Sequence, residues 1–153
     1  MAIFILGMSC AISGRQIESA SQAIAFPAFV SNEADPLLIF NDAVVHAEEF
    51  ALHPLASRAI SRLEEFRSQT TPSARACLHC KRPITNPDDY IGFGHITDAR
   101  NVRLHSLNYC HLHRTCVAAW SMRGQALADL ELLEKSGDWK GNGLRELISV
   151  LRI

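Results

Sequence analysis

The sequence has no apolar run that approaches the roughly 20 residues a membrane-spanning helix needs. It also lacks a basic segment ahead of the short apolar stretch in residues 1–10, where a secretory signal would carry one. We therefore expect residues 1–10 to form a first β-strand. The same absences predict a cytoplasmic protein that has no membrane partner.

A complete disulfide framework is excluded because the five cysteines are an odd number. The expected compartment keeps thiols reduced, and closely spaced cysteines in such proteins are more often metal ligands. Hydrophobic residues make up 48% of the chain and charged residues 20%, which is typical of a globular protein. A length of 153 residues suits one compact domain or two very small ones packed together.

A strong excess of basic charge is missing too, since the formal net charge is −1. Residues 1–71 carry four basic and eight acidic side chains, a net −4, and residues 72–153 carry eleven and eight, a net +3. Nucleic-acid-binding proteins usually show a strongly basic stripe. The second half is therefore expected to present a solvated basic face, formed by Lys81, Arg82, Arg100, Arg103, Arg114 and Arg123.

What the chain does contain is an internal repeat. Residues 10–67 align with residues 77–134 without a gap at a shift of 67, and 12 of the 58 positions are identical. Average composition would give roughly four identities by chance. The identical pairs include Cys10/Cys77, Arg15/Arg82, Phe26/Phe93, Asn41/Asn108 and His46/His113. The sequence thus predicts a duplicated fold.

Each copy is expected to contain the same elements in the same order, which predicts an α+β fold. A cysteine-bearing turn leads to an extended stretch, residues 23–30 or 90–97, and then to a short strand, residues 37–40 or 102–107. A helix closes each copy, over residues 45–66 with a break before Pro54, and over residues 113–133. A tail helix from about Asn142 is predicted to bury Leu144, Leu147, Ile148 and Leu151, with Trp139 beside it.

The second copy carries two ligand pairs, Cys77-x2-Cys80 and His113-x2-Cys116. Zinc favours four tetrahedral sulfur and nitrogen ligands, and four good ligands leave no open position for catalysis. One structural zinc ion is predicted here, ahead of a dithiol redox motif or unmetallated core thiols. His111 also precedes Cys116 closely, but the repeat favours His113 because His46 occupies the equivalent position in the first copy.

The first copy has Cys10, Ser13, His46 and Glu49 at the same four positions. Serine is a poor zinc ligand at neutral pH, so this copy is interpreted as a degenerate, metal-free repeat. The sequence leaves open whether Cys10, His46 and Glu49 retain any metal affinity. The fold of this copy is expected to depend on aromatic packing by Phe26, Phe29, Phe40, Phe50 and Phe66.

A cysteine knuckle, a strand pair and a His-x2-Cys pair that opens a helix resemble a treble-clef zinc finger of the LIM-type and RING-like group. The resemblance covers residues 77–134 and, through the repeat, residues 10–67. It implies a degenerate repeat in residues 1–71 and a zinc-binding repeat in residues 72–136. The predicted tail helix makes residues 137–153 a separate helical tail. Both LIM and RING modules hold two ions, whereas this chain has one complete set of ligands. The ubiquitin-ligase activity of RING modules is therefore not implied. The ligands it implies are Cys77, Cys80, His113 and Cys116.

These features favour a non-enzymatic protein-binding module, an adaptor or an inhibitor such as an immunity-type protein that neutralises a bacterial toxin. A protein partner is therefore expected. One alternative is a nucleic-acid-binding zinc protein. Another is a degenerate treble-clef nuclease, for which Asp88, Asp89 and Asp98 are the candidate metal carboxylates.

Overall fold

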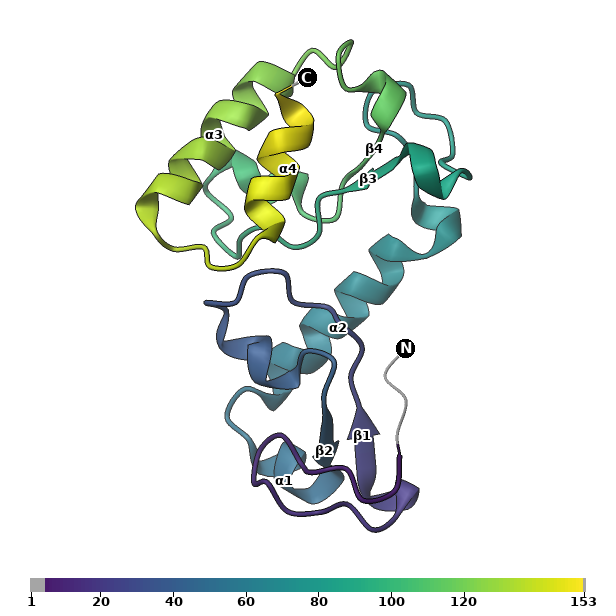
Figure 1. The fold of residues 1–153 in the computed structure, drawn as a ribbon, viewed down its shortest axis with the longest axis vertical. Helices are drawn as coiled ribbons and strands as arrows, with labels where there is room; N and C mark the ends of the chain where they lie inside the picture. Colours follow the sequence, from purple (N-terminus) through teal and green to yellow (C-terminus); the bar gives the residue numbers. More distant parts are fainter. Residues whose placement is uncertain (1–4, 153) are drawn as a thin grey trace. The chain divides into compact units, whose positions relative to one another are not determined.

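Two short β-hairpins organise the part of the chain that the computed structural model describes, residues 5–152 (Figure 1). The chain divides into two units. Unit 1 comprises Met1–Val30 and Asp35–Glu65, and unit 2 comprises Ser31–Ala34 and Phe66–Ile153. The described residues contain four α-helices and two antiparallel two-stranded sheets, which confirms the predicted α+β class.

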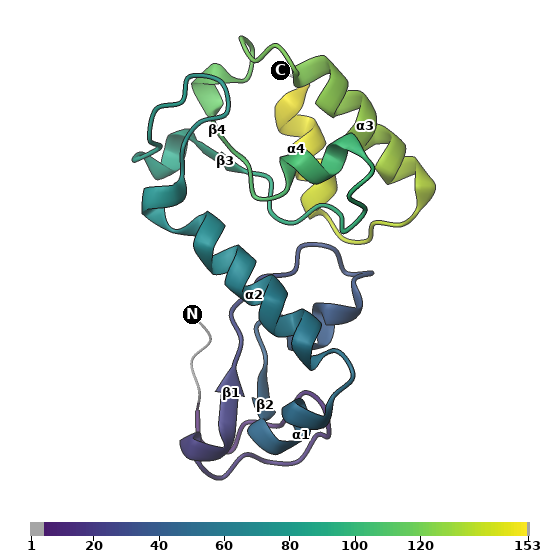
Figure 2. The ribbon, with the colours of Figure 1, turned by 180° about the vertical axis from the view of Figure 1, so that it is seen from behind.

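In unit 1, strand β1 (Ala23–Ala25) pairs with β2 (Val44–His46), so that Ile24 lies opposite Val45. Helix α1 (Ala47–Leu52) follows β2 directly and lies at the end of the hairpin (Figure 2). Helix α2 (Ala56–Thr70) begins after Pro54, which confirms the predicted break, and its residues from Phe66 onward belong to unit 2. Two 3₁₀ helices complete the unit, Ala20–Gln22 and Pro36–Phe40.

Four phenylalanines form the centre of unit 1, as predicted. Phe26 contacts Phe40 and Phe50 with ring centroids 5.4 and 5.1 Å apart, and Phe29 lies 6.0 Å from Phe26. All four rings are buried. Phe66 differs from the prediction, because it lies in unit 2 and packs edge-on against Tyr109.

In unit 2, strand β3 (Tyr90–Gly92) pairs with β4 (His111–His113). Helix α3 (Arg123–Ser136) ends at Gly137, whose left-handed φ of 78° suits glycine, and helix α4 (Gly143–Leu151) follows. The two helices lie side by side in both views (Figures 1 and 2). The 3₁₀ helices of this unit are Pro72–Ala74, Pro87–Asp89, Arg103–Leu107 and Arg114–Cys116.

The tail helix α4 confirms its predicted start and its apolar face. Residues at positions i, i+3, i+4 and i+7 of a helix share one side, and the four predicted leucine and isoleucine side chains are all buried in the core of unit 2. Trp139 packs against the same core. The tail is therefore an integral part of unit 2.

Two kinds of predicted element were wrong. Residues 37–40 and 102–107 form 3₁₀ helices rather than strands. In the first, the Asp35 side chain accepts a hydrogen bond from the Leu37 N–H, and Pro36 supplies the fixed φ of a helical first position. The second strand of each hairpin is instead β2 or β4. These strands include residues 45 and 113, where the closing helices were predicted to begin, so both helices begin later. The predicted extended stretches are strands only over β1 and β3.

The N-terminal strand prediction falls partly on residues 1–4, which lie outside the described residues. From Ile5 onward the chain turns at Leu6 and Gly7 and makes a single bridge between Ser9 and Gln16 instead of a continuous strand. No helix among residues 5–152 has the length and apolar character needed to cross a membrane.

The spacing of 67 residues recurs in the structure, since β1 and β2 correspond to β3 and β4 residue for residue. The 3₁₀ helices Pro36–Phe40 and Arg103–Leu107 correspond in the same way. Asn41 Oδ1 accepts hydrogen bonds from the N–H groups of residues 29 and 30, and Asn108 Oδ1 accepts them from residues 96 and 97. The two units therefore share local hydrogen-bonding patterns as well as element order.

Candidate metal centre

A tight turn in unit 2 presents the first two predicted ligands. The Cys77 N–H donates to the Arg82 carbonyl at 2.9 Å, and the Lys81 N–H donates to the Cys77 carbonyl at the same distance. Lys81 closes the turn with a left-handed φ of 62°, where the first unit has Gly14 at 73°. The turn brings the sulfur atoms of Cys77 and Cys80 to the same site.

The second ligand pair comes from the end of strand β4. His113 is the last residue of β4, and Cys116 closes the 3₁₀ helix that follows. The knuckle is tied to this strand because the Leu78 N–H donates to the His111 carbonyl at 2.8 Å. The predicted placement of Cys116 at the start of a long helix was wrong, since α3 begins only at Arg123.

One ligand atom from each of Cys77, Cys80, His113 and Cys116 lies within 4.8 Å of all the others. Cys77 is fully buried, and the other three are partly exposed. Zinc bonds of about 2.0–2.3 Å place tetrahedral ligand atoms roughly 3.3–3.8 Å apart, and Cys80 Sγ lies 3.4 Å from His113 Nδ1. The cluster can hold a metal ion, and its sulfur and nitrogen donors are compatible with zinc.

The groups around the cluster give its three thiols unequal pKa values. Burial would raise the pKa of Cys77, but the N–H groups of Cys80 and His113 bring it below its ordinary value. The Arg82 N–H and guanidinium lower the pKa of Cys80 to about 6. Burial and the neighbouring sulfurs raise the pKa of Cys116 to about 11. Three close sulfur atoms resist becoming anions together, so a divalent cation would favour the fully ionised set.

Two polar residues near the cluster have contacts that differ from the roles expected of them from the sequence, a nuclease carboxylate for Asp89 and a solvated basic face for Arg82. Asp89 accepts hydrogen bonds from the Thr115 N–H at 2.9 Å and from its hydroxyl at 3.1 Å, which fixes the turn that carries Cys116. The Arg82 guanidinium forms a hydrogen bond with the Cys80 sulfur, and this bond raises the pKa of Arg82. The identity of Arg15 and Arg82 in the repeat was the available signal for the second of these residues.

The other candidate side chains lie outside this cluster. Both ring nitrogens of His111 have hydrogen-bond partners, the Gln69 carbonyl at 2.9 Å and the Tyr90 hydroxyl at 3.1 Å, and the cluster contains His113 rather than His111. His79, which lies between Cys77 and Cys80 in the turn, is exposed. Cys110 is only half-buried and donates to the Ser106 carbonyl.

Three of the four residues of unit 1 that align with the metal ligands of unit 2 lie close together. Donor atoms of Cys10, His46 and Glu49 also lie within 4.8 Å of one another, whereas Ser13 is exposed and outside this group. Cys10 Sγ donates to Glu49 Oε2 at 2.9 Å. Hydrogen bonds from Cys10, Ser13 and Arg15 lower the pKa of Glu49 to about 2. This carboxylate is therefore ionised at neutral pH.

The fold and the four-residue cluster define a small α+β protein with a candidate metal centre. Comparison of the chain with family models, with curated proteins and with solved structures finds no match.

Proposed function

We propose that this protein is a non-enzymatic protein-binding module stabilised by one structural zinc ion. The observation that carries the proposal is the convergence of Cys77, Cys80, His113 and Cys116. Catalytic zinc sites have three protein ligands and an open fourth position, whereas four protein ligands complete the tetrahedron. Such an ion fixes the knuckle to the end of β4 and leaves no coordination site for a substrate.

The proposed architecture is a duplicated treble clef. Its support is the recurrence of hairpin, 3₁₀ helix and asparagine hydrogen bonds at a spacing of 67 residues. In this interpretation residues 1–71 are the degenerate repeat, which folds without a metal. Residues 72–136 are the zinc-binding repeat, and residues 137–153 are a helical tail.

The acidic residues of the nuclease alternative have other contacts. Asp89 holds the Thr115 turn, and Asp98 pairs with His95 Nε2 at 3.1 Å. Among the described residues, neither of the two clusters able to hold a metal contains Asp88, Asp89 or Asp98. These contacts favour a structural role for the acids and a protein without catalysis.

The basic residues of the nucleic-acid alternative are also partly engaged. Arg103 forms a bidentate pair with Asp129 at 2.9 and 3.0 Å. Arg82 interacts with the Cys80 sulfur. Engaged guanidinium groups contribute less to phosphate binding, so the charge pattern favours a protein partner.

A hollow in unit 2 offers a place for that partner. It has a volume of about 400 Å³ beside the knuckle, and its apolar lining includes Leu78, Leu107, Trp120 and Met122. The Met122 side chain is 52% exposed. Exposed Lys81 at the rim adds a positive charge. The partner segment that fits is therefore an apolar side chain next to an acidic residue, bound by an adaptor or inhibitor.

The test is affinity purification of the zinc-loaded full chain with crosslinks mapped to residues. We expect a stoichiometric protein partner, with crosslinks near Lys81, that is lost from Met122→Glu. The matched control is Leu132→Glu, which places the same charge on another exposed apolar position, 64% exposed, outside this hollow. Equal recovery by both variants, or a purified chain without zinc, would contradict the proposal.

A further inference from the structure

The three-residue cluster of unit 1 contains a buried polar atom that has no hydrogen-bond partner among the described residues. That atom is Nδ1 of His46, a residue only 7% exposed. It lies 3.6 Å from Glu49 Oε2, beyond hydrogen-bonding distance. Buried polar atoms are nearly always paired, so an unpaired one that faces a thiol and a carboxylate points to an absent ligand.

The cluster also repeats the local geometry of the metal centre in unit 2. The His46 N–H donates to Cys10 Sγ at 3.3 Å, as the His113 N–H does to Cys77 Sγ at 3.4 Å. In both units the cysteine comes from the knuckle turn and the histidine ends the second strand of the hairpin. Glu49, in the first turn of α1, aligns with Cys116, which carries the third sulfur of the unit 2 cluster.

The two oxygens of Glu49 face different groups. Oε2 contacts Cys10 Sγ at 2.9 Å and lies near His46, while Oε1 accepts from Arg15 Nε at 2.9 Å. Arg15 also reaches Glu48 at 3.1 Å. A cation that used Oε2 would not displace the arginine. Arg15 would hold the carboxylate in place, as outer-shell partners of metal ligands do.

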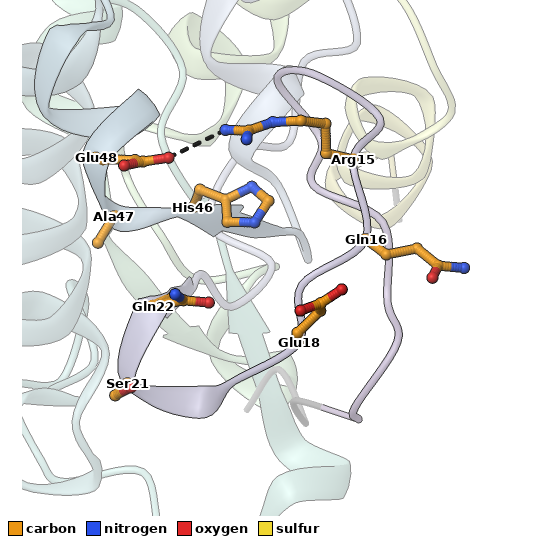
Figure 3. Close-up of a pocket in the computed structure, with 8 residues that line it drawn as sticks. All are labelled: Arg15, Gln16, Glu18, Ser21, Gln22, His46, Ala47 and Glu48. Carbon is orange, nitrogen blue, oxygen red and sulfur yellow. Dashed lines mark hydrogen bonds and ion pairs between the residues drawn. The ribbon is translucent and has the colours of Figure 1, made fainter.

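A polar hollow of about 730 Å³ adjoins this cluster. Figure 3 shows the His46 ring between the Arg15–Glu48 ion pair and the side chains of Glu18 and Gln22. The hollow gives water and small ions a path to the histidine. It also leaves space for a water molecule beside His46, which is the one member of the cluster that lines it.

We propose that Cys10, His46 and Glu49 form a second, exchangeable site for a borderline divalent cation such as Zn²⁺. Thiolate, imidazole and carboxylate are all zinc ligands, and water completes the tetrahedron. On binding, the Cys10 proton is released to solvent and a metal–sulfur bond replaces the hydrogen bond to Glu49. The phenylalanine cluster maintains the fold of unit 1 without the ion, so this site is optional. Its water-filled fourth position distinguishes it from the four-ligand site of unit 2, and the proposed function is argued from the unit 2 site alone.

The test is equilibrium dialysis of the reduced full chain against rising buffered concentrations of free Zn²⁺, with metal counted per chain. We expect two binding steps. The weaker step is lost in Glu49→Gln and weakened about 10- to 100-fold in Arg15→Gln, the range typical of outer-shell partners. Cys116→Ser removes the tighter step only, which separates a failure of this proposal from a failure of the structural zinc site. Cys110→Ser changes neither step.

Cobalt provides a second measurement on the unaltered protein. The second equivalent of Co²⁺ should add sulfur-to-metal charge-transfer absorption that Cys10→Ser abolishes. Circular dichroism confirms that the Cys10, Arg15 and Glu49 variants are folded. Binding of only one equivalent by wild type, or a second step that Glu49→Gln and Cys10→Ser leave unchanged, would overturn the proposal.

Discussion

The three cysteines of the unit 2 cluster differ in how readily they lose a proton. Cys80, with a pKa of about 6, is mostly a thiolate at pH 7, whereas Cys116, with a pKa of about 11, is mostly a thiol. Zinc binds only thiolate, so the ion must displace the Cys116 proton. The affinity of the site should therefore depend on pH in a defined direction.

We predict that the first equivalent of zinc releases at least one proton per chain at neutral pH. The logarithm of the affinity should rise with pH between about 6 and 11, because Cys116 binds a proton in the free protein and none in the complex. As the pH falls toward 6 and below it the slope should steepen, since His113, whose pKa is raised by its hydrogen bond to Cys77, and then Cys80 also bind protons in the free protein. Calorimetry in buffers of different ionisation enthalpy measures the proton count.

The matched control for this titration is Cys110→Ser, which removes a thiol of the same unit that lies outside the cluster. It should release the same number of protons as wild type. Zinc binding that is independent of pH from 6 to 8 would show that the thiols are not ligands.

At the scale of secondary-structure elements, one asparagine in each unit follows a 3₁₀ helix and accepts hydrogen bonds from the backbone of an earlier segment. These residues are Asn41, after Pro36–Phe40, and Asn108, after Arg103–Leu107. Asn108 Oδ1 accepts from the Ile96 and Thr97 N–H groups at 2.8 and 3.1 Å, and its Nδ2 donates to the Thr97 carbonyl at 2.7 Å. These bonds fix the irregular segment between β3 and the helix Arg103–Leu107. No hydrophobic pattern identifies such a bond, although the identity of Asn41 and Asn108 in the repeat marks the position.

We predict that Asn108→Ala lowers the free energy of unfolding by about 1–3 kcal/mol, because it leaves backbone donors without an acceptor. Denaturant unfolding followed by tryptophan fluorescence measures this, since Trp120 and Trp139 both lie in unit 2. Asn101→Ala, at an exposed turn position, is the control and should change stability by less than about 0.5 kcal/mol. Equal effects of the two variants would contradict the prediction.

The same elements show which parts of the fold the sequence could predict. Helix α4 was predictable because its buried residues repeat at helical spacing around one face. Residues 37–40 were wrongly predicted to form a strand because Leu37 and Phe40 are buried in a 3₁₀ helix, and a short apolar run has the same sequence pattern in either element. The four ligands of the cluster were predictable from the spacing within the Cys-x2-Cys and His-x2-Cys pairs. That spacing is the same whether Cys116 ends a 3₁₀ helix, as it does here, or opens a long helix. The cluster of Cys10, His46 and Glu49 in unit 1 could not be predicted in the same way. Arg15 holds Glu49 through a contact that spans 34 positions, so no local sequence pattern indicates it.

At the scale of the whole molecule, the two units are stabilised in different ways. Unit 1 has an aromatic centre of Phe26, Phe29, Phe40 and Phe50 and an ion pair between Arg15 and Glu49. Unit 2 has a mostly aliphatic core, with Phe93 and Trp120 among its members, that joins α3 and α4 to the hairpin, and the candidate metal cluster lies at the knuckle. Metal removal should therefore affect the units unequally.

We predict that a strong chelator unfolds the hairpin of unit 2 and leaves that of unit 1 folded. A structural zinc ion contributes about 10–16 kcal/mol in finger peptides, which is as large as the roughly 5–15 kcal/mol of total stability in a typical domain. Hydrogen exchange resolved by peptide should show lost protection in β3 and β4 and retained protection in β1 and β2. Zinc-treated Cys116→Ser should behave like the chelated wild type, and Cys110→Ser like the zinc-loaded one. Simultaneous loss of protection in both hairpins would mean that unit 1 depends on a metal for its fold, whereas unchanged protection in β4 would mean that packing alone holds His113 beside the knuckle.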